Sequence, residues 1–144
     1  MEHLIYKNLK KIELSGIRKF TNMLVDYPNA INLTIGQPDF PTPMHVKERA
    51  KDAIDQNYTS YTPNAGILEL RKAITKFYEE NYGLCYNQQD EVIVTHGASG
   101  ALTIALRTIL DEGCEVILSA PAYPGYIPLI ELCGAVPVCV DTAE

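Results

Sequence analysis

Apolar residues recur with a helical period in the first half of the chain. Val46, Ala50 and Ile54 recur at spacings of about four residues, which predicts a helix that opens at Pro43. A second amphipathic helix is predicted for residues 67–82. Its apolar face would carry Ile67, Leu70, Ile74 and Phe77, and its solvent face Glu69, Arg71, Lys72 and Lys76.

The pattern changes in the second half, where short β-branched segments alternate with apolar helical ones. Strands are predicted at residues 92–95, 115–119 and 136–140, and helices at residues 98–110 and 126–132. The first of these helices is apolar nearly all round, so we expect it to be buried. Strands that alternate with helices form βαβ units and a parallel sheet, so the predicted fold class is α/β.

The segments before the first predicted strand of the second half are less regular. Residues 1–30 are expected to form an arm and a short helix. Residues 31–35 are expected to form a short strand that ends at the turn-forming residues 36–39. Residues 58–66 are polar and contain proline, so a loop is predicted there. We find no internal repeat and no low-complexity tract.

The segment from Val92 to Ala101 carries the strongest sign of a ligand site. A β-branched strand runs into the small residues Gly97-Ala98-Ser99-Gly100 and then directly into an apolar helix. Small residues let the backbone approach an anion, and the first turn of a helix leaves N–H groups that point toward it. Ser99 adds a hydroxyl. The segment predicts a phosphate site, although the same sequence also suits a plain tight turn.

This turn does not match the dinucleotide or P-loop patterns. A dinucleotide site needs G-x-G-x-x-G and an acidic residue about 20 positions later, whereas the next strand here ends Leu118-Ser119-Ala120. No Gly-Lys-Ser/Thr follows the turn, which excludes a P-loop. Aromatic residues within Pro121–Tyr126 follow the same strand, where a ring can stack on a flat heterocycle. The combination favours a planar, phosphorylated cofactor.

Composition and charge exclude several classes of partner. The chain has 144 residues, of which 47% are hydrophobic, as is typical of a globular protein. Its formal net charge of −6 argues against nucleic acid or an anionic membrane as a partner. No apolar run reaches the roughly 20 residues that span a bilayer, and no signal-peptide pattern is present, so a cytoplasmic location is expected. The cysteines show no metal-ligand spacing and are expected to be buried free thiols: Cys85, Cys114, Cys133 and Cys139.

Four motifs, in this order, resemble the N-terminal part of the fold-type I aminotransferases of class I/II, which use pyridoxal 5'-phosphate (PLP). The motifs are Leu33–Phe40, Ser60–Gly66 with Leu70-Arg71 after it, the turn Gly97–Ala101, and Pro121–Tyr126. The resemblance covers nearly all of the 144 residues, and the four motifs together are far more specific than any one alone. The sequences of these motifs are most similar to those of bacterial enzymes that act on aromatic amino acids or on N-acetyl-diaminopimelate.

The resemblance implies five cofactor-binding residues. Gly97, Ala98 and Ser99 would bind the cofactor phosphate, and Tyr123 would stack on the pyridine ring. Tyr61 would reach the phosphate held by the neighbouring subunit, because the active sites of this family form at the interface of a homodimer. The resemblance thus implies PLP as the cofactor and a second copy of the chain as a partner.

The resemblance also implies a substrate site for an amino acid and a 2-oxo acid. Gly36 would contact the substrate carboxylate through its backbone, and Ile17 in the N-terminal arm would line the pocket. His96 precedes the phosphate turn at a position that varies in the family, so no role is assigned to it. No metal ligand is expected.

The lysine that this chemistry needs is absent from the chain. The family uses a lysine far downstream of the phosphate turn to form a Schiff base with PLP, but no lysine follows Lys76. The lysines that precede the turn are expected to be solvated on polar helix faces: Lys47, Lys51, Lys72 and Lys76. No catalytic residue is identified, and these residues are expected to be a truncated, inactive portion of an enzyme.

Two other functions remain open. A related PLP-dependent lyase of the cystathionine or aminocyclopropane-carboxylate type would share the motifs, and a non-catalytic chain that binds PLP or subunits would explain the missing lysine. Residues 1–40 are expected to be the arm and substrate loop of a small domain, and residues 41–144 the start of the PLP-binding large domain. Because only three strands of a larger parallel sheet are present, the chain by itself is expected to be poorly soluble.

Overall fold

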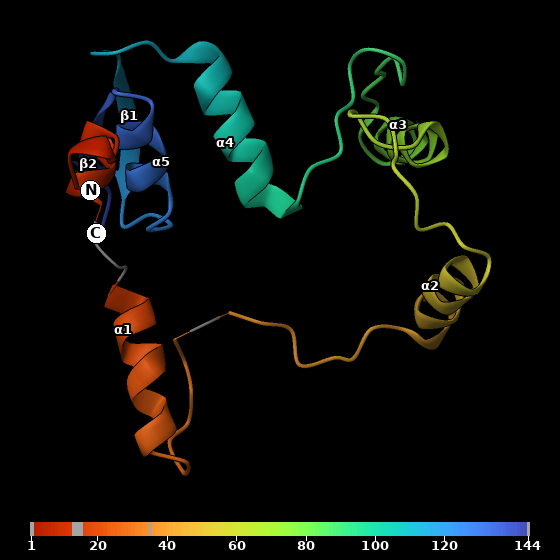
Figure 1. Ribbon diagram of the computed structural model, residues 1–144, viewed down its shortest axis with the longest axis horizontal. Helices are drawn as coiled ribbons and strands as arrows, with labels where there is room; N and C mark the ends of the chain where they lie inside the picture. The colour runs from red at the N-terminus through yellow and green to blue at the C-terminus, as the bar shows by residue number, and fades with distance from the viewer. Residues whose placement is uncertain (1, 13–15, 35, 144) are drawn as a thin grey trace. The chain divides into compact units, whose positions relative to one another are not determined.

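Two units make up the part of the chain that the structure describes, which is residues 2–12, 16–34 and 36–143 of a computed structural model (Figure 1). The first unit combines Met1–Gly36 with His96–Glu144, and the second unit is Gln37–Thr95. The chain therefore leaves the first unit after residue 36 and returns to it at residue 96.

A parallel two-stranded sheet with a crossover helix forms the centre of the first unit. Strands β1 (Glu115–Ala120) and β2 (Val136–Asp141) pair in parallel, and α5 (Tyr126–Leu132) connects them. Ile130 on α5 is 1% exposed, and Ala135 is the other buried apolar residue among those described. The predicted βαβ unit is confirmed, with each strand one residue longer than expected.

The sheet is covered on one face only. Along β1, half-buried residues alternate with exposed ones, and Ile117 on the open face is 74% exposed. At the carboxyl edge, Ala120 pairs with Asp141, and both the N–H and the hydroxyl of Thr142 donate to the Ala120 carbonyl. The register therefore brings the ends of both strands to one edge, immediately before the segment that contains Tyr123.

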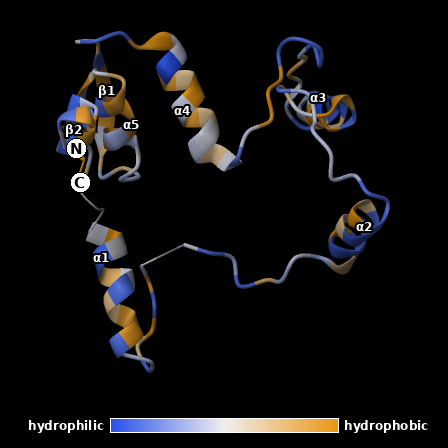
Figure 2. Cartoon of the chain, in the orientation of Figure 1, coloured by the Kyte–Doolittle hydropathy of each residue, from blue (hydrophilic) through white to orange (hydrophobic). Residues whose placement is uncertain are grey.

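Helix α4 (Gly97–Ile109) contacts α5, but the expectation that it is buried is wrong for this chain. None of its described residues is buried, and Ile104 and Ile109 are 49% and 72% exposed. Figure 2 shows apolar positions along this helix. The physical reason is coverage, because a helix that is apolar nearly all round needs neighbours on several sides, whereas the seven-residue α5 covers one.

The N-terminal region forms several short helices, whereas an arm and one short helix are predicted for residues 1–30. They are the 3-10 helices η1 (Glu2–Leu4), η2 (Lys7–Lys11) and η3 (Leu24–Asp26), and the α-helix α1 (Gly16–Met23). Helix η2 contacts α5, and an ion pair of 2.8 Å joins Lys7 Nζ to Glu112 Oε1. These contacts attach the start of the chain to the βαβ unit.

Two helices joined by loops form the second unit. Helix α2 (Met44–Asp55) begins directly after Pro43, and α3 (Leu68–Tyr82) begins after Ile67, both as predicted. Gly83 ends α3 in the left-handed conformation, with its N–H donating to the Glu79 carbonyl. Local signals therefore set the ends of both helices.

Two predicted strands are not formed. Residues 31–34 are irregular, and Ile35 lies outside the described residues. Residues 92–95 belong to no helix or strand; the N–H of Val94 donates to the Ala65 carbonyl at 3.0 Å. A β-branched sequence becomes a strand only beside a second strand, and β1 and β2 pair with each other in the other unit.

The four cysteines are free thiols, as predicted, but they are not buried. Cys114 and Cys133 are half-buried, and Cys85 and Cys139 are exposed. Cys139 lies on β2 in the sheet that is covered on one face only, and Cys85 lies in the segment after α3. Across the described residues, no helix has both the length and the apolar character to cross a bilayer.

Candidate functional site

The predicted phosphate turn forms the N-terminus of α4. Ala98 and Ser99 lie exposed in the first turn, where backbone N–H groups have no carbonyl of the same helix to bind. His96 precedes this turn and its side chain makes no capping hydrogen bond. Gly97 carries no side chain there, and apart from its chain neighbours and the backbone of its own helix nothing lies within 4 Å of where a Cβ would be. An anion can therefore reach the backbone N–H groups of Ala98 and Ser99 from solvent, at the positive end of the helix dipole.

Tyr123 lies at the carboxyl edge of the sheet, in the turn between β1 and α5. Its side chain is 54% exposed and meets the ring of Tyr126 edge-on, with ring centroids 5.4 Å apart. A Cβ at Gly125 would overlap the ring atoms Cε1 and Cζ of Tyr123, so glycine at this position makes room for the ring. An exposed aromatic ring at this edge suits stacking on a flat ligand.

The phosphate turn and Tyr123 belong to neighbouring elements of the first unit. The turn opens α4, which contacts α5, and α5 begins three residues after Tyr123. Side chains that hold a metal are not grouped anywhere in the described structure: no cluster of three or more His, Cys, Asp or Glu occurs there. Backbone donors, one hydroxyl and one aromatic ring are thus what this region offers to a ligand.

The two candidate substrate residues lie on segments that are joined by hydroxyl groups. Ile17 is the second residue of α1 and is 44% exposed. The hydroxyl of Thr21 lies 2.9 Å from that of Thr34, two residues before Gly36, and the Thr34 hydroxyl donates to Asn32 Oδ1 at 2.7 Å. The Thr21 hydroxyl also lies 2.9 Å from the Ile17 carbonyl, to which it donates. The structure thereby brings together the segments that contain Ile17 and Gly36.

Nothing in the structure requires glycine at position 36 for conformation or packing. Gly36 is exposed, its φ is outside the left-handed region, and no atom lies within 4 Å of an added Cβ. An open backbone of this kind is accessible to a ligand carboxylate. The role predicted for Gly36 stays a prediction, as do the roles of the other site residues.

Tyr61 belongs to the second unit and lies in the predicted loop of residues 58–66. Its side chain is fully exposed. The N–H of Gly66 donates to the Pro63 carbonyl and closes a turn at the end of this loop. A tyrosine that projects from a closed loop into solvent is available to a partner outside its own unit.

Arg71 lies on the buried side of α3, and its predicted solvent position is wrong. Its side chain is 7% exposed and donates to the backbone carbonyls of Gly66, Gln88 and Gln89. An arginine can be buried when its donors are satisfied, and its length lets it reach carbonyls that helical periodicity does not consider. The motif Leu70-Arg71 singled this arginine out without indicating its partners.

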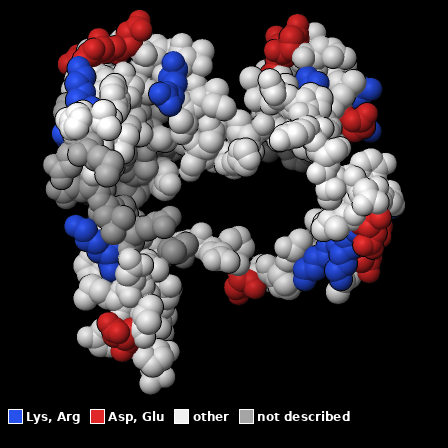
Figure 3. Space-filling model, viewed as in Figure 1, with Lys and Arg blue, Asp and Glu red and all other residues white. Residues whose placement is uncertain are grey.

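The apolar face predicted for α3 is also largely uncovered. Ile67, Leu70 and Phe77 are 43%, 42% and 52% exposed, while Ile74 is half-buried. The lysines, in contrast, are solvated as expected: Lys47, Lys51, Lys72 and Lys76 are exposed. Figure 3 shows basic and acidic side chains side by side on α2, where Arg49 and Asp52 are 3.9 Å apart.

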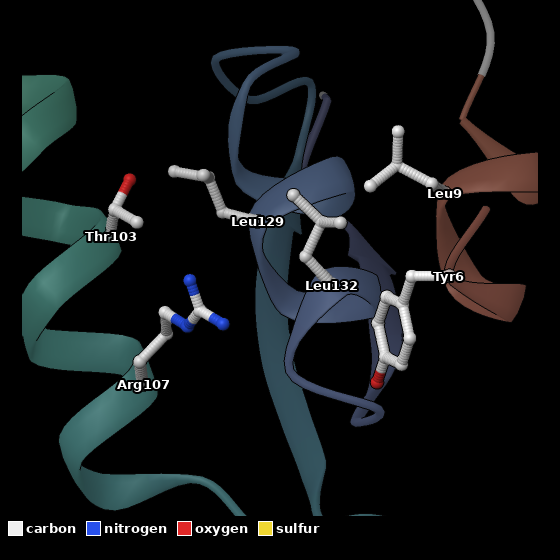
Figure 4. Close-up of a pocket in the computed structure, with 6 residues that line it drawn as sticks. All are labelled: Tyr6, Leu9, Thr103, Arg107, Leu129 and Leu132. Atoms are coloured by element: carbon white, nitrogen blue, oxygen red, sulfur yellow. The ribbon is translucent and has the colours of Figure 1, made fainter. Parts of the chain in front are cut away.

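A pocket of about 360 Å³ in the first unit lies apart from the candidate site residues (Figure 4). It is bordered by η2, α4 and α5, with Arg107 extending toward α5. Its lining residues are Tyr6, Leu9, Thr103, Arg107, Leu129 and Leu132. The walls are mainly apolar, which marks it as space between packed helices.

Comparison with known proteins identifies the family. The sequence model described as aminotransferase class I and II matches residues 28–144. The chain belongs to this family. Its solved structural neighbours are fold-type I aminotransferases, so the predicted fold class is confirmed.

The relatives of this aminotransferase chain include proteins of the two kinds that its motifs resemble. A probable N-acetyl-LL-diaminopimelate aminotransferase of Bacillus subtilis is 56% identical over all 144 residues, which are 37% of its length. Aromatic-amino-acid aminotransferase 2 of Thermococcus litoralis is 37% identical over 136 residues, covering 94% of this chain and 35% of the relative.

A solved structure extends this likeness to the fold. N-succinyldiaminopimelate aminotransferase of Mycobacterium tuberculosis matches with a TM-score of 0.90 and 29% identity, covering 97% of this chain and 36% of that one. The chain thus spans a little over a third of the length of the relatives that it matches.

Proposed function

We propose that this chain supplies the N-terminal part of a PLP-dependent aminotransferase that moves an amino group between an amino acid and a 2-oxo acid. The observation that carries the proposal is the 56% identity, along the entire chain, to a probable N-acetyl-LL-diaminopimelate aminotransferase. On the same ground we propose N-acetyl-LL-diaminopimelate as the amino-acid substrate. A cytoplasmic location belongs to the same proposal.

The exposed groups of the first unit fit a phosphorylated aromatic cofactor. The backbone of Gly97 and Ala98 and the hydroxyl of Ser99 would hold the phosphate at the start of α4, and Tyr123 would cover one face of the ring. PLP, when bound, supplies an electron-accepting ring for the amino transfer. The chain's own part is to bind and orient: Gly36 would donate its N–H to the substrate carboxylate, and Ile17 would shield the site from water.

The proposal also includes a homodimer. Tyr61 is fully exposed on a loop of the second unit, and its hydroxyl would donate to the phosphate held by the partner subunit. We further propose that residues 1–40 belong to the small domain and residues 41–144 to the large, PLP-binding domain. Because no lysine follows Lys76, residues 1–144 by themselves would not catalyse the reaction.

The first test is the intact mass of the protein purified from the cell that encodes it, after incubation with PLP and reduction with borohydride. We expect a chain much heavier than 16.0 kDa that carries one reduced pyridoxyl group. The same incubation without borohydride is the control, since an unreduced adduct is lost on denaturation. A chain of 16.0 kDa without an adduct would contradict the proposal.

The second test is amino transfer by the same preparation. With N-acetyl-LL-diaminopimelate and a 2-oxo acid, we expect one new amino acid for each molecule of amino donor consumed. Product that forms without any 2-oxo acceptor, with release of ammonia or a thiol, would indicate a lyase instead. Transfer from aromatic amino acids alone would keep the reaction and overturn the proposed substrate.

A further inference from the structure

Arg71 is the charged side chain that the described structure buries, and its partners are main-chain atoms. Its Nε donates to the Gly66 carbonyl at 3.1 Å, and one Nη donates to the carbonyls of Gln88 and Gln89 at 2.7 and 2.9 Å. Helix α3, the end of the loop of residues 58–66 and the segment of residues 87–91 are therefore held together by one side chain. Bonds from a buried charged donor are strong ones.

A second contact fixes the same end of the loop. The N–H of Val94 donates to the Ala65 carbonyl at 3.0 Å. Gly66 has a φ of 94°, and a Cβ there would lie 2.7 and 2.8 Å from side-chain atoms of Val94. Backbone and side chain thus meet so closely that only glycine fits, and the loop end is locked to the segment that leads toward the phosphate turn.

The other end of the loop is fixed by helix α2. The N–H of Tyr58 donates to the Ala53 carbonyl at 2.9 Å, and Asn57 takes a left-handed conformation with a φ of 61°. Tyr61 stands between these two anchors with its side chain fully exposed. The loop that carries Tyr61 is therefore anchored at both ends.

We propose that Arg71 is the positioning residue for Tyr61. The proposal rests on the proposed function, in which Tyr61 donates to the phosphate of PLP in the partner subunit. Arg71 does not touch the cofactor: it holds the Gly66 carbonyl, and through the turn of residues 63–66 it holds the tyrosine hydroxyl where the phosphate binds. When the hydrogen bonds of Arg71 are lost, Tyr61 keeps its hydroxyl group, but that hydroxyl no longer lies where the phosphate binds.

The test is a double-mutant cycle on PLP binding to the full-length protein, with Arg71→Lys, Tyr61→Phe and the double variant. Lysine keeps the charge but cannot reproduce the planar set of donors. We expect each single variant to raise the dissociation constant of PLP about tenfold. Because both substitutions remove the same interaction, the double variant should be no weaker than either single one. Lys72→Gln, at an exposed neighbouring position, is the matched control and should bind PLP as the wild type does.

The cycle separates this inference from the function on which it depends. If the two single effects multiply, or if Arg71→Lys leaves PLP binding unchanged, Arg71 does not act through Tyr61 and the inference is overturned. If Tyr61→Phe binds PLP normally, the role of Tyr61 fails and the inference fails with it. Amino transfer by the wild type decides the proposed function separately, whatever the cycle shows.

A second variant keeps the test open if Arg71→Lys does not fold. Val94→Ala removes the side chain that packs on Gly66 while leaving the Arg71 bonds in place. In the same cycle with Tyr61→Phe, it is expected to weaken PLP binding less than about threefold, without adding to the effect of Tyr61→Phe. An independent, multiplying effect of Val94→Ala would overturn the positioning argument.

Discussion

At the scale of single residues, Gly125 links backbone geometry to the candidate cofactor site. Its φ of −75° and ψ of −18° suit any residue, so alanine would not strain the backbone at the start of α5. A methyl group there would overlap the ring of Tyr123 and force the ring to move. Position 125 therefore tests the role of Tyr123 without altering the tyrosine itself.

Gly125→Ala is expected to weaken PLP binding to the full-length protein about fivefold, which corresponds to the loss of one aromatic stacking contact. Titration of the apoprotein with PLP, followed by absorbance, measures the change. Gly16→Ala is the matched control, since open space surrounds the added methyl group. Unchanged affinity in Gly125→Ala would argue against stacking by Tyr123.

Ser99→Ala is expected to raise the dissociation constant of PLP by about one order of magnitude, because a hydrogen bond to a charged phosphate is lost. The affinity for pyridoxal, which lacks the phosphate, should not change. Thr108→Val removes a hydroxyl lower on the same helix, where it donates to the Ile104 carbonyl, and serves as the control. Equal loss of affinity for PLP and for pyridoxal would contradict a phosphate contact.

At the scale of elements, the α-helices were predictable from the sequence, and so was the paired sheet, whereas the 3-10 helices of the N-terminal region were not. Proline before α2 and glycine after α3 are local signals, and the pair β1–β2 follows from the βαβ pattern. Residues 92–95 were not predictable in the same way, because a strand depends on a neighbour that sequence period does not reveal. The burial of Arg71 was missed for a related reason. Helical periodicity predicts the face of the helix on which a side chain begins, but not the groups that a long side chain reaches.

In the candidate site too, features that depend on adjacent residues were predictable, and features that depend on contacts between distant residues were not. The glycine-rich start of α4 and the aromatic residue after β1 were found from sequence because each depends on a few adjacent residues. The hydroxyl link from Thr21 to Thr34 and the fit of Gly125 under Tyr123 depend on contacts between residues that no periodic pattern relates. Contacts of that kind were beyond prediction from one sequence.

The attachment of η2 is expected to depend on pH. The hydrogen bond and charge of Glu112 raise the pKa of Lys7 above its usual 10.5. A raised pKa stabilises the attached state below the usual pKa and ceases to do so as the pH rises through the raised value. Leu9 and Leu132 line one pocket, and the proximity of their methyl groups should therefore persist at pH 9 and be lost progressively above pH 10.5.

Nuclear Overhauser effects between those methyl groups measure this attachment. Lys7→Gln should weaken them already at neutral pH, and added salt should do so in the wild type because the pair is solvent-exposed. Lys10→Gln, at another exposed position of η2, is the control. Nuclear Overhauser effects that stay constant up to about pH 12 would show that apolar contacts alone hold η2 against α5.

At the scale of the whole molecule, the residues that the structure describes bury little apolar surface. Ile130 and Ala135 are the buried apolar residues in the described part of the chain, and one face of the β1–β2 sheet is open. Cooperative unfolding requires a shared core, which these residues do not supply within the two units. The family relatives are more than twice as long and have further chain to cover such surfaces.

The isolated 144-residue chain is accordingly expected to be poorly soluble and to melt without a sharp transition. Calorimetry and circular dichroism measure the transition, and binding of a hydrophobic dye reports the exposed apolar surface. The full-length protein under the same conditions is the control and should melt cooperatively. A sharp, monomeric melt of the 144-residue chain would contradict this prediction.

The hydrogen bonds from Arg71 to main-chain carbonyls have a consequence for which substitutions the sequence can accept. The acceptors at positions 88 and 89 are peptide carbonyls, which every amino acid provides, so substitutions at those two positions should preserve the hydrogen bonds of Arg71. The donor is not interchangeable, because no other side chain offers the same planar fork. In a survey of all single substitutions, position 71 should tolerate none, whereas positions 88 and 89 should tolerate most. Proline at position 89 is the exception, because it would remove an N–H that donates to Asn87.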